Sequence, residues 1–240
     1  MKRLLCMGLL LGVLCGCAPV MQAETVATPL EAALRLEQSL EQGEDTLLLR
    51  SEEKLDGEAL FQVTEAIWPY AFTMGLTTYG NGLTEISVQV SDKARQEQAA
   101  QLAKGLAEQA TAGMTAPRDK LRALHDLLVR SCVYDVQTSE QEDAADGAGA
   151  PFTAYGALVD GKAVCAGYAR AYVLLCRAVG LDTIYVASNE MNHGWNAVRL
   201  DGQTYFIDCT FDDPVPDQGE YVTDEYFLLT TDQLRQTHTW

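Results

Sequence analysis

The chain has 240 residues, of which 48% are hydrophobic, so a packed core is expected and general disorder is excluded. Its 17 Lys and Arg stand against 34 Asp and Glu, which gives a formal charge of −17. Nucleic-acid binders present basic patches, so this balance argues against a nucleic-acid partner and is typical of an acidic, soluble surface. The length allows one sizeable domain, or a small domain with an appendage.

The first predicted element is a targeting segment at residues 1–17. Two basic residues precede an apolar run at 4–14, which is too short to span a bilayer and suits the core of a signal peptide. Residues 14–17 (LCGC) then resemble the lipobox of bacterial lipoproteins, with Cys17 as the lipidated residue. We therefore expect an extracytoplasmic protein that is lipid-anchored to the cell membrane. An ordinary secretory signal, which would give a secreted protein, is the alternative.

Residues 18–113 are expected to form a tether followed by a small α/β region. Helices are predicted at 31–42, which Gly43 ends, at 56–67 and at 92–112. Strands are predicted at 46–50 and at 84–90, where apolar and polar residues alternate strictly. This region carries no recognisable chemistry.

Residues 114–240 are expected to form the second region. Pro117 suits the first turn of a helix that ends near Cys132. A second helix begins at Cys165, has apolar residues at a period of 3.6 and ends at Gly180. Cys165 therefore lies in a first helical turn, where unpaired N–H groups and the helix dipole stabilise a thiolate. A buried cysteine that only packs is the alternative.

A β-hairpin is predicted next, with strands at 193–200 and 203–210 joined by an Asp-Gly turn. A two-residue turn places Trp195 opposite Asp208. His193 and Asp208 are then diagonal neighbours on one face, roughly 7–8 Å apart at their backbones, so that the carboxylate reaches the imidazole. A register shifted by one residue would place them on opposite faces.

Cys165, His193 and Asp208 have the chemistry of a cysteine nucleophile, its base and the group that orients the base. A zinc site formed by Cys165, His193 and Cys209 is disfavoured because these spacings match no compact metal motif, so no metal and no cofactor are expected. The sequence leaves open whether Cys132 and Cys209 form a disulfide.

Three other polar residues are predicted to be structural. His125 lies on the helix that begins at Pro117, with nothing reactive near it in the sequence, so a packed or partly exposed side chain is expected. Asp212 and Asp213 precede Pro214 and are expected to form a turn without chemistry.

Four motifs in this order resemble the bacterial transglutaminase-like superfamily. They are 154–158 (AYGAL), 161–169 (GKAVCAGYA), 193–196 (HGWN) and 208–214 (DCTFDDP). The resemblance covers about half the chain and departs from the family at Gly194, where Ala is commoner, and at Phe211, where Trp is commoner. It implies an α+β fold with a papain-like core, in which a central Cys helix packs against an antiparallel sheet, here with an N-terminal α/β extension.

The resemblance also implies a reaction and the residues that carry it. Cys165 would be the nucleophile, His193 the base and Asp208 the orienter, with the Cys165 N–H as an oxyanion donor and Tyr155 as a weaker second candidate. The expected function is a thiol-dependent amide hydrolase or acyltransferase, protease-like or transglutaminase-like, acting on peptides or proteins through a thioester. The alternative is a non-catalytic module that binds peptide or cell wall in the same groove.

Overall fold

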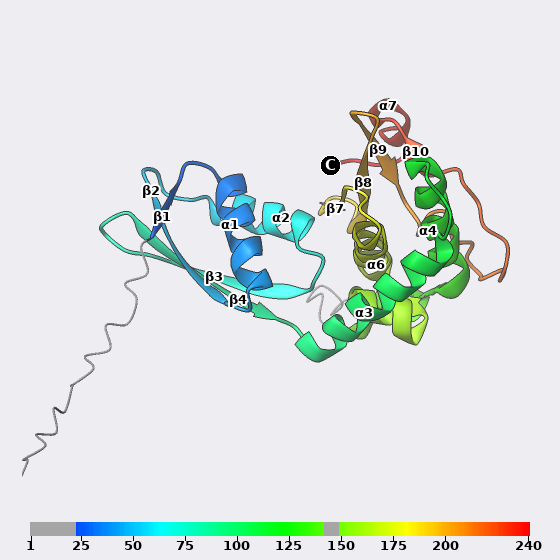
Figure 1. Ribbon diagram of the computed structural model, residues 1–240, viewed down its shortest axis with the longest axis horizontal. Helices are drawn as coiled ribbons and strands as arrows, with labels where there is room; N and C mark the ends of the chain where they lie inside the picture. Colours follow the sequence, from blue (N-terminus) through cyan, green and yellow to red (C-terminus); the bar gives the residue numbers. More distant parts are fainter. Residues whose placement is uncertain (1–22, 142–148) are drawn as a thin grey trace, which may run out of the picture.

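The computed structural model describes residues 23–141 and 149–240, so the predicted signal peptide and Cys17 lie outside the described residues. Two lobes follow one another along the chain (Figure 1). The N-terminal lobe contains β1 (Glu24–Val26), α1 (Pro29–Glu41), β2 (Thr46–Ser51), α2 (Gly57–Ile67), β3 (Phe72–Thr78) and β4 (Leu83–Val90). The C-terminal lobe contains α3 (Lys93–Ala110), α4 (Pro117–Ser131), β5 (Val133–Tyr134), α5 (Val136–Ser139), η2 (Ala150–Phe152), η3 (Gly156–Asp160), β6 (Lys162–Ala163), α6 (Cys165–Ala178), β7 (Thr183–Ser188), β8 (His193–Leu200), β9 (Gln203–Ile207), β10 (Phe227–Leu229) and α7 (Thr231–Leu234).

The N-terminal lobe is a four-stranded sheet in the order β1-β2-β4-β3, with α1 and α2 against it (Figure 1). Its core contains Leu36 of α1, Leu60 of α2 and Ile86 of β4, all fully buried. The predicted helices at 31–42 and 56–67 and the two predicted strands are confirmed within a few residues. The third predicted helix, at 92–112, is α3 and packs in the C-terminal lobe rather than in this one. The sequence prediction missed β1, which has only three residues, and β3, although Phe72, Met74 and Leu76 alternate with Thr and Gly along it.

The C-terminal lobe confirms the predicted α+β architecture, in which a central helix packs against an antiparallel sheet. Its main sheet has the order β10-β9-β8-β7, and every pair in it is antiparallel, whereas β5 and β6 form a separate parallel pair. Helix α6 is buried from Gly167 to Cys176 because it contacts this sheet on one side and α3 and α4 on the other. Ala99, Ala103 and Ala107 of α3 are small enough to let the two helices approach closely.

The predicted hairpin register is confirmed. Leu200 pairs with Gln203, and Asn196 pairs with Ile207. Both turn residues have positive φ, 51° at Asp201 and 78° at Gly202, as a type I′ turn requires. The hairpin therefore carries His193 at the start of β8 and Asp208 directly after β9, on the same face.

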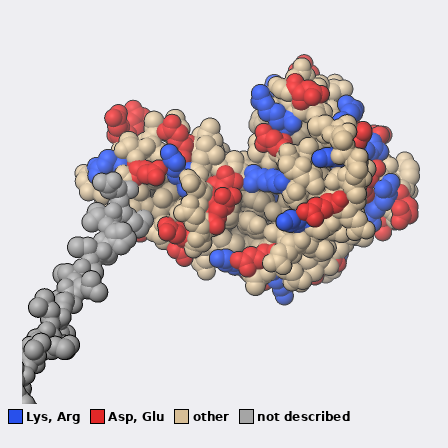
Figure 2. All heavy atoms as spheres, in the orientation of Figure 1, with Lys and Arg blue, Asp and Glu red and all other residues tan. Residues whose placement is uncertain are grey.

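Ion pairs connect the two lobes. Arg170 of α6 lies 2.6 Å from Glu65 of α2, and Arg177 of α6 lies 3.2 Å from Glu37 of α1. Acidic and basic side chains are interspersed over the visible face of both lobes (Figure 2). Among residues 23–141 and 149–240, no helix combines the length and the apolar character that crossing a bilayer needs.

Candidate active site

Cys165 is the first residue of α6, as predicted, and the surrounding backbone is close-packed. Val164 precedes it in an extended conformation and caps the helix without a side-chain hydrogen bond. At Gly167 any Cβ would collide with the carbonyl oxygen of Pro151, so only glycine lets η2 approach the first turn of the helix. The Cys165 N–H belongs to the group at a helix start that has no acceptor within the helix.

Cys165 also differs from the other described cysteines. All four are free thiols, but Cys132, Cys176 and Cys209 are buried whereas Cys165 is partly exposed. Burial raises the pKa of Cys132 and of Cys176 to about 12, which keeps these two thiols protonated near neutral pH. Cys165 is therefore the thiol best placed to react with a molecule from solvent.

The structure brings His193 and Asp208 together. Nε2 of His193 lies 2.6 Å from Oδ2 of Asp208, and the two side chains are 9% and 0% exposed. Because Nε2 is committed to the carboxylate, Nδ1 is the nitrogen left for the sulfur of Cys165. This is the tautomer that a carboxylate-oriented base requires.

The site stabilises the protonated form of His193. Burial of the ring opposes its protonation, but the hydrogen bond with Asp208 and the contact with the Cys165 thiol outweigh burial and raise the pKa of His193 to about 10. The thiol therefore lies within reach of the imidazole. An imidazolium beside a thiolate is the resting pair from which a cysteine nucleophile acts.

Asp208 is fully buried and accepts four hydrogen bonds. Its Oδ1 accepts from the backbone N–H groups of Thr210 at 2.9 Å and Phe211 at 3.1 Å. Its Oδ2 lies 2.6 Å from His193 and 3.0 Å from Nε2 of a second histidine, His238. Burial raises the pKa of the carboxyl, but the two histidines and the Phe211 N–H outweigh it and leave the pKa below its usual value.

Tyr185 explains why residue 194 is a glycine. A Cβ at Gly194 would lie 2.6 Å from the Tyr185 hydroxyl and 2.7 Å from its ring, well inside normal contact. The Tyr185 ring packs on Ala169 of α6 and lies 5.0 Å from the guanidinium of Arg170. Burial raises the pKa of Tyr185.

Two hydrogen bonds fix α6 relative to the strands that carry the other site residues. The Asn196 side chain on β8 donates to the carbonyl of Ala169 at 2.9 Å, which ties α6 to the strand that begins with His193. The Tyr168 hydroxyl, one turn after Cys165, donates to Asp213 at 2.5 Å. Burial raises the pKa of Asp213 to about 6. Asp213 is therefore a buried anchor as well as a residue of the turn that the sequence predicts.

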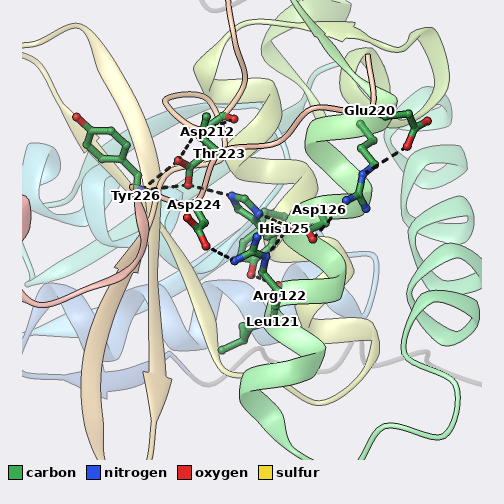
Figure 3. A network of polar contacts seen from close by, with 11 residues as sticks. Leu121, Arg122, His125, Asp126, Asp212, Glu220, Thr223, Asp224 and Tyr226 are labelled. Carbon is green, nitrogen blue, oxygen red and sulfur yellow. Dashed lines mark hydrogen bonds and ion pairs between the residues drawn. The ribbon is translucent and has the colours of Figure 1, made fainter. Parts of the chain in front are cut away.

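Another buried histidine, His125, orders the loop that follows Asp208 (Figure 3). His125 of α4 is fully buried, with Nδ1 3.0 Å from Asp126 and Nε2 3.1 Å from Asp212. Burial opposes its protonation, but the two carboxylates outweigh burial and raise the His125 pKa. Asp212 also accepts from the Thr223 hydroxyl at 2.7 Å and from the Tyr226 N–H. The predicted turn is confirmed, because the Asp212 N–H donates to the Asp208 carbonyl and the Asp213 N–H to the Thr210 carbonyl. Within this turn Asp212, like Asp213, is also a buried anchor.

The remaining predicted site residue, Tyr155, lies directly before η3. Its ring is half-buried, and the guanidinium of Arg95 on α3 lies 5.2 Å from the ring centroid. An oxyanion role for Tyr155 stays a prediction.

His193, Asp208 and His238 are also the group of described residues with ligand atoms close enough for a metal, all within 4.8 Å of one another. Both imidazoles direct Nε2 at the same carboxylate oxygen, however. A metal would bind the lone pair of an unprotonated Nε2. These two hydrogen bonds instead require each Nε2 to carry a hydrogen. The arrangement is therefore better suited to holding protons than to holding an ion.

Sequence reasoning missed His238. It lies 30 residues after Asp208, in a Thr-His-Thr-Trp segment that matches no catalytic motif. Its one signal is scarcity, because it is one of three histidines in the chain.

Comparisons with known proteins show what the chain is similar to. Residues 104–208 match the family model of the Transglutaminase-like superfamily, a stretch that contains Cys165 and His193 and ends at Asp208. Kyphoscoliosis peptidase from Mus musculus is 25% identical over an alignment of 130 residues that covers 47% of this chain and 19% of the mouse protein, so the chain spans about a fifth of that relative.

Two solved structures are also similar to this chain. One is described as a TGase, with 17% identity, a TM-score of 0.39 and coverage of 69% of this chain and 50% of the other. The other is a cysteine-protease candidate from Cytophaga hutchinsonii, with 14% identity, a TM-score of 0.38 and coverage of 61% of this chain and 64% of the other.

Proposed function

Because residues 104–208 form a domain of the transglutaminase-like superfamily, we propose that the protein breaks amide bonds of peptides or proteins with Cys165 as its nucleophile. The observation that carries the proposal is the 2.6 Å contact between His193 and Asp208, next to a partly exposed thiol at the start of α6. Each of the three groups has the environment that its role requires.

The reaction proceeds in two steps. The Cys165 sulfur attacks the amide carbon, and the imidazolium of His193 gives the Nδ1 proton to the departing amine, which leaves a thioester on the enzyme. In the second step neutral His193 takes a proton from the incoming acceptor, whose attack releases the acyl group and restores the thiolate. Asp208 keeps the ring oriented throughout and stabilises its charged form.

The tetrahedral intermediate carries negative charge on oxygen. The Cys165 N–H at the start of α6 is a donor for this charge, and the helix dipole points the same way. Tyr155 remains the weaker candidate for a second donor. Phe211 offers an apolar surface beside the imidazole, because it is 42% exposed and its ring lies 4.8 Å from that of His193.

The acceptor decides whether the enzyme is a hydrolase or an acyltransferase. Water gives free acid, and a primary amine gives a new amide. The test is to incubate the purified protein with a peptide library containing glutamine and glycine-rich sequences, with and without a labelled primary amine, and to analyse products by mass spectrometry. We expect cleavage, deamidation or amine incorporation that Cys165→Ala abolishes.

Cys132→Ala is the matched control, since it removes a thiol that is buried away from solvent. It should keep the wild-type rate. Peptide binding without turnover, equal in the wild type and Cys165→Ala, would replace the enzyme with the binding module considered from the sequence.

The same proposal includes location outside the cytoplasm through a lipid on Cys17. The support is the order of basic residues, apolar run and LCGC motif at the start of the chain. Expression in a bacterial host with a radiolabelled fatty acid tests it. Label should enter the wild type and not Cys17→Ala, and unlabelled wild-type protein in the medium would instead support the secreted alternative.

A further inference from the structure

One oxygen of Asp208 serves two imidazoles. Oδ2 lies 2.6 Å from Nε2 of His193 and 3.0 Å from Nε2 of His238. An ionised carboxylate only accepts hydrogen bonds, so both Nε2 atoms carry hydrogen and both rings donate. His238 therefore makes a direct contact with the triad carboxylate, although it lies 30 residues beyond the end of the family match.

The surroundings fix the position of the His238 ring. Helix α7 is preceded by a capping box at Thr230 and ends at Leu234. The His238 N–H donates to the carbonyl of Leu234 at 2.9 Å. The imidazole then packs edge-on against Trp195 and at a tilt against Phe211, with ring centroids 4.8 Å away in both cases. Its side chain is fully buried.

The other nitrogen of His238 has a partner that adapts to either charge state. Nδ1 lies 2.8 Å from the Thr237 hydroxyl, and this hydroxyl lies 3.3 Å from the carbonyl of Leu234. When His238 is neutral, Thr237 donates to Nδ1. When His238 is charged, the ring donates to Thr237, which donates to Leu234. The Nε2–H remains on Asp208 in both states.

The Nε2–H donor of His238 matters because the Asp208 side chain is fully buried and has no contact with solvent. Burial is the largest influence on its carboxyl and favours the neutral acid, in which it could no longer hold the imidazolium of His193. Oδ1 has two backbone donors, whereas Oδ2 has only the two histidines among the described contacts. Besides burial, the Asp208 charge helps to raise the pKa of Tyr134 on β5 and of Cys209. The ring of Tyr226 lies 5.7 Å from the His238 ring.

We infer that His238 is a positioning residue of this site, which keeps the Asp208 carboxylate ionised and aimed at His193 by donating Nε2–H to Oδ2. This inference rests on the proposed function of Cys165. On this inference the segment that follows α7 contributes directly to the active site. The chemistry asked of residue 238 is a single N–H donor.

The experiment compares His238→Gln, which keeps an N–H donor, with His238→Leu, which removes it. The rate at which iodoacetamide modifies Cys165 is measured from pH 4 to 9 on the purified full-length protein by mass spectrometry of the Cys165 peptide. We expect His238→Leu to shift the acid-side midpoint of this profile to higher pH by about one to two units, the size of one hydrogen bond to a charged group. His238→Gln should stay within a few tenths of a unit of the wild type.

Folding is monitored by near-ultraviolet circular dichroism, and equal reactivity of the wild type and His238→Leu at pH 9 shows that the site is intact. A His238→Leu profile that coincides with the wild type overturns the inference, as does an equal shift in both variants. Failure of the proposed function has a different signature. Wild-type Cys165 would then react no faster than in His193→Ala, which overturns the nucleophile and the role of His238 together.

Discussion

The contact between Gly194 and Tyr185 makes Gly194→Ala a sharp test of how the site is packed. An alanine Cβ would lie 2.6 Å from the Tyr185 hydroxyl, about 0.8 Å short of the 3.4 Å at which ordinary contact begins. Tyr185 cannot easily yield, since it is 7% exposed and packs on α6. Overpacking of this kind costs about 1–3 kcal/mol of unfolding free energy. We therefore expect Gly194→Ala to destabilise the protein by that amount in urea unfolding.

Substitutions of Tyr185 separate overlap with its ring from other causes of the lost stability. Tyr185→Phe keeps the ring, whose atoms would still lie 2.7 and 2.9 Å from the new Cβ, so Gly194→Ala should cost about as much in this background. Tyr185→Val removes the ring, and there Gly194→Ala should cost less than about 0.5 kcal/mol, which gives a large coupling energy in the double-mutant cycle. Equal costs of Gly194→Ala in the Val and Phe backgrounds would refute the reasoning.

Three further predictions concern charge and metal. Asp208→Asn removes the carboxylate that helps to raise the His193 pKa to about 10. The alkaline limb of kcat/KM should therefore move to lower pH by about 1–3 units, and kcat/KM should fall roughly 10²–10⁴-fold. An alkaline limb that does not move would contradict the role of Asp208 as the partner of His193. His125→Ala leaves the fully buried Asp212 without its cation and should cost about 3–5 kcal/mol at pH 5. Because the His125 pKa is raised, its charged contribution is fully present below about pH 6.5 and is lost as pH rises through the folded value, so the stability difference between the wild type and His125→Ala in urea unfolding should narrow at high pH. Chelation with EDTA should leave the turnover rate unchanged, and a loss that Zn²⁺ restores would instead point to an ion at His193, Asp208 and His238.

Much of the C-terminal lobe was predictable from local rules. The 3.6-residue period after Cys165 predicts where the helix starts. The Asp-Gly turn predicts the hairpin register, and this register brings His193 beside Asp208. Register is predictable here because side chains on a strand alternate, so a single tight turn determines every facing pair.

The unpredicted parts depend on contacts between segments far apart in the chain. His238, His125 and Asp212 have unremarkable neighbours in the sequence, and their roles arise only when α4, the loop after β9 and the segment after α7 meet. Gly194 is similar. No local pattern shows that Tyr185 on the neighbouring strand fills the space of its missing side chain.

The central claim is that the acyl group passes through Cys165. The direct measurement is the intact mass of the protein after rapid acid quenching during turnover of a peptide found in the library screen. We expect the mass of the acyl fragment to be added to Cys165, to be removed by hydroxylamine and to be absent from Cys165→Ala. Turnover at the full wild-type rate in Cys165→Ala, or an adduct on any other residue in place of Cys165, would contradict the account.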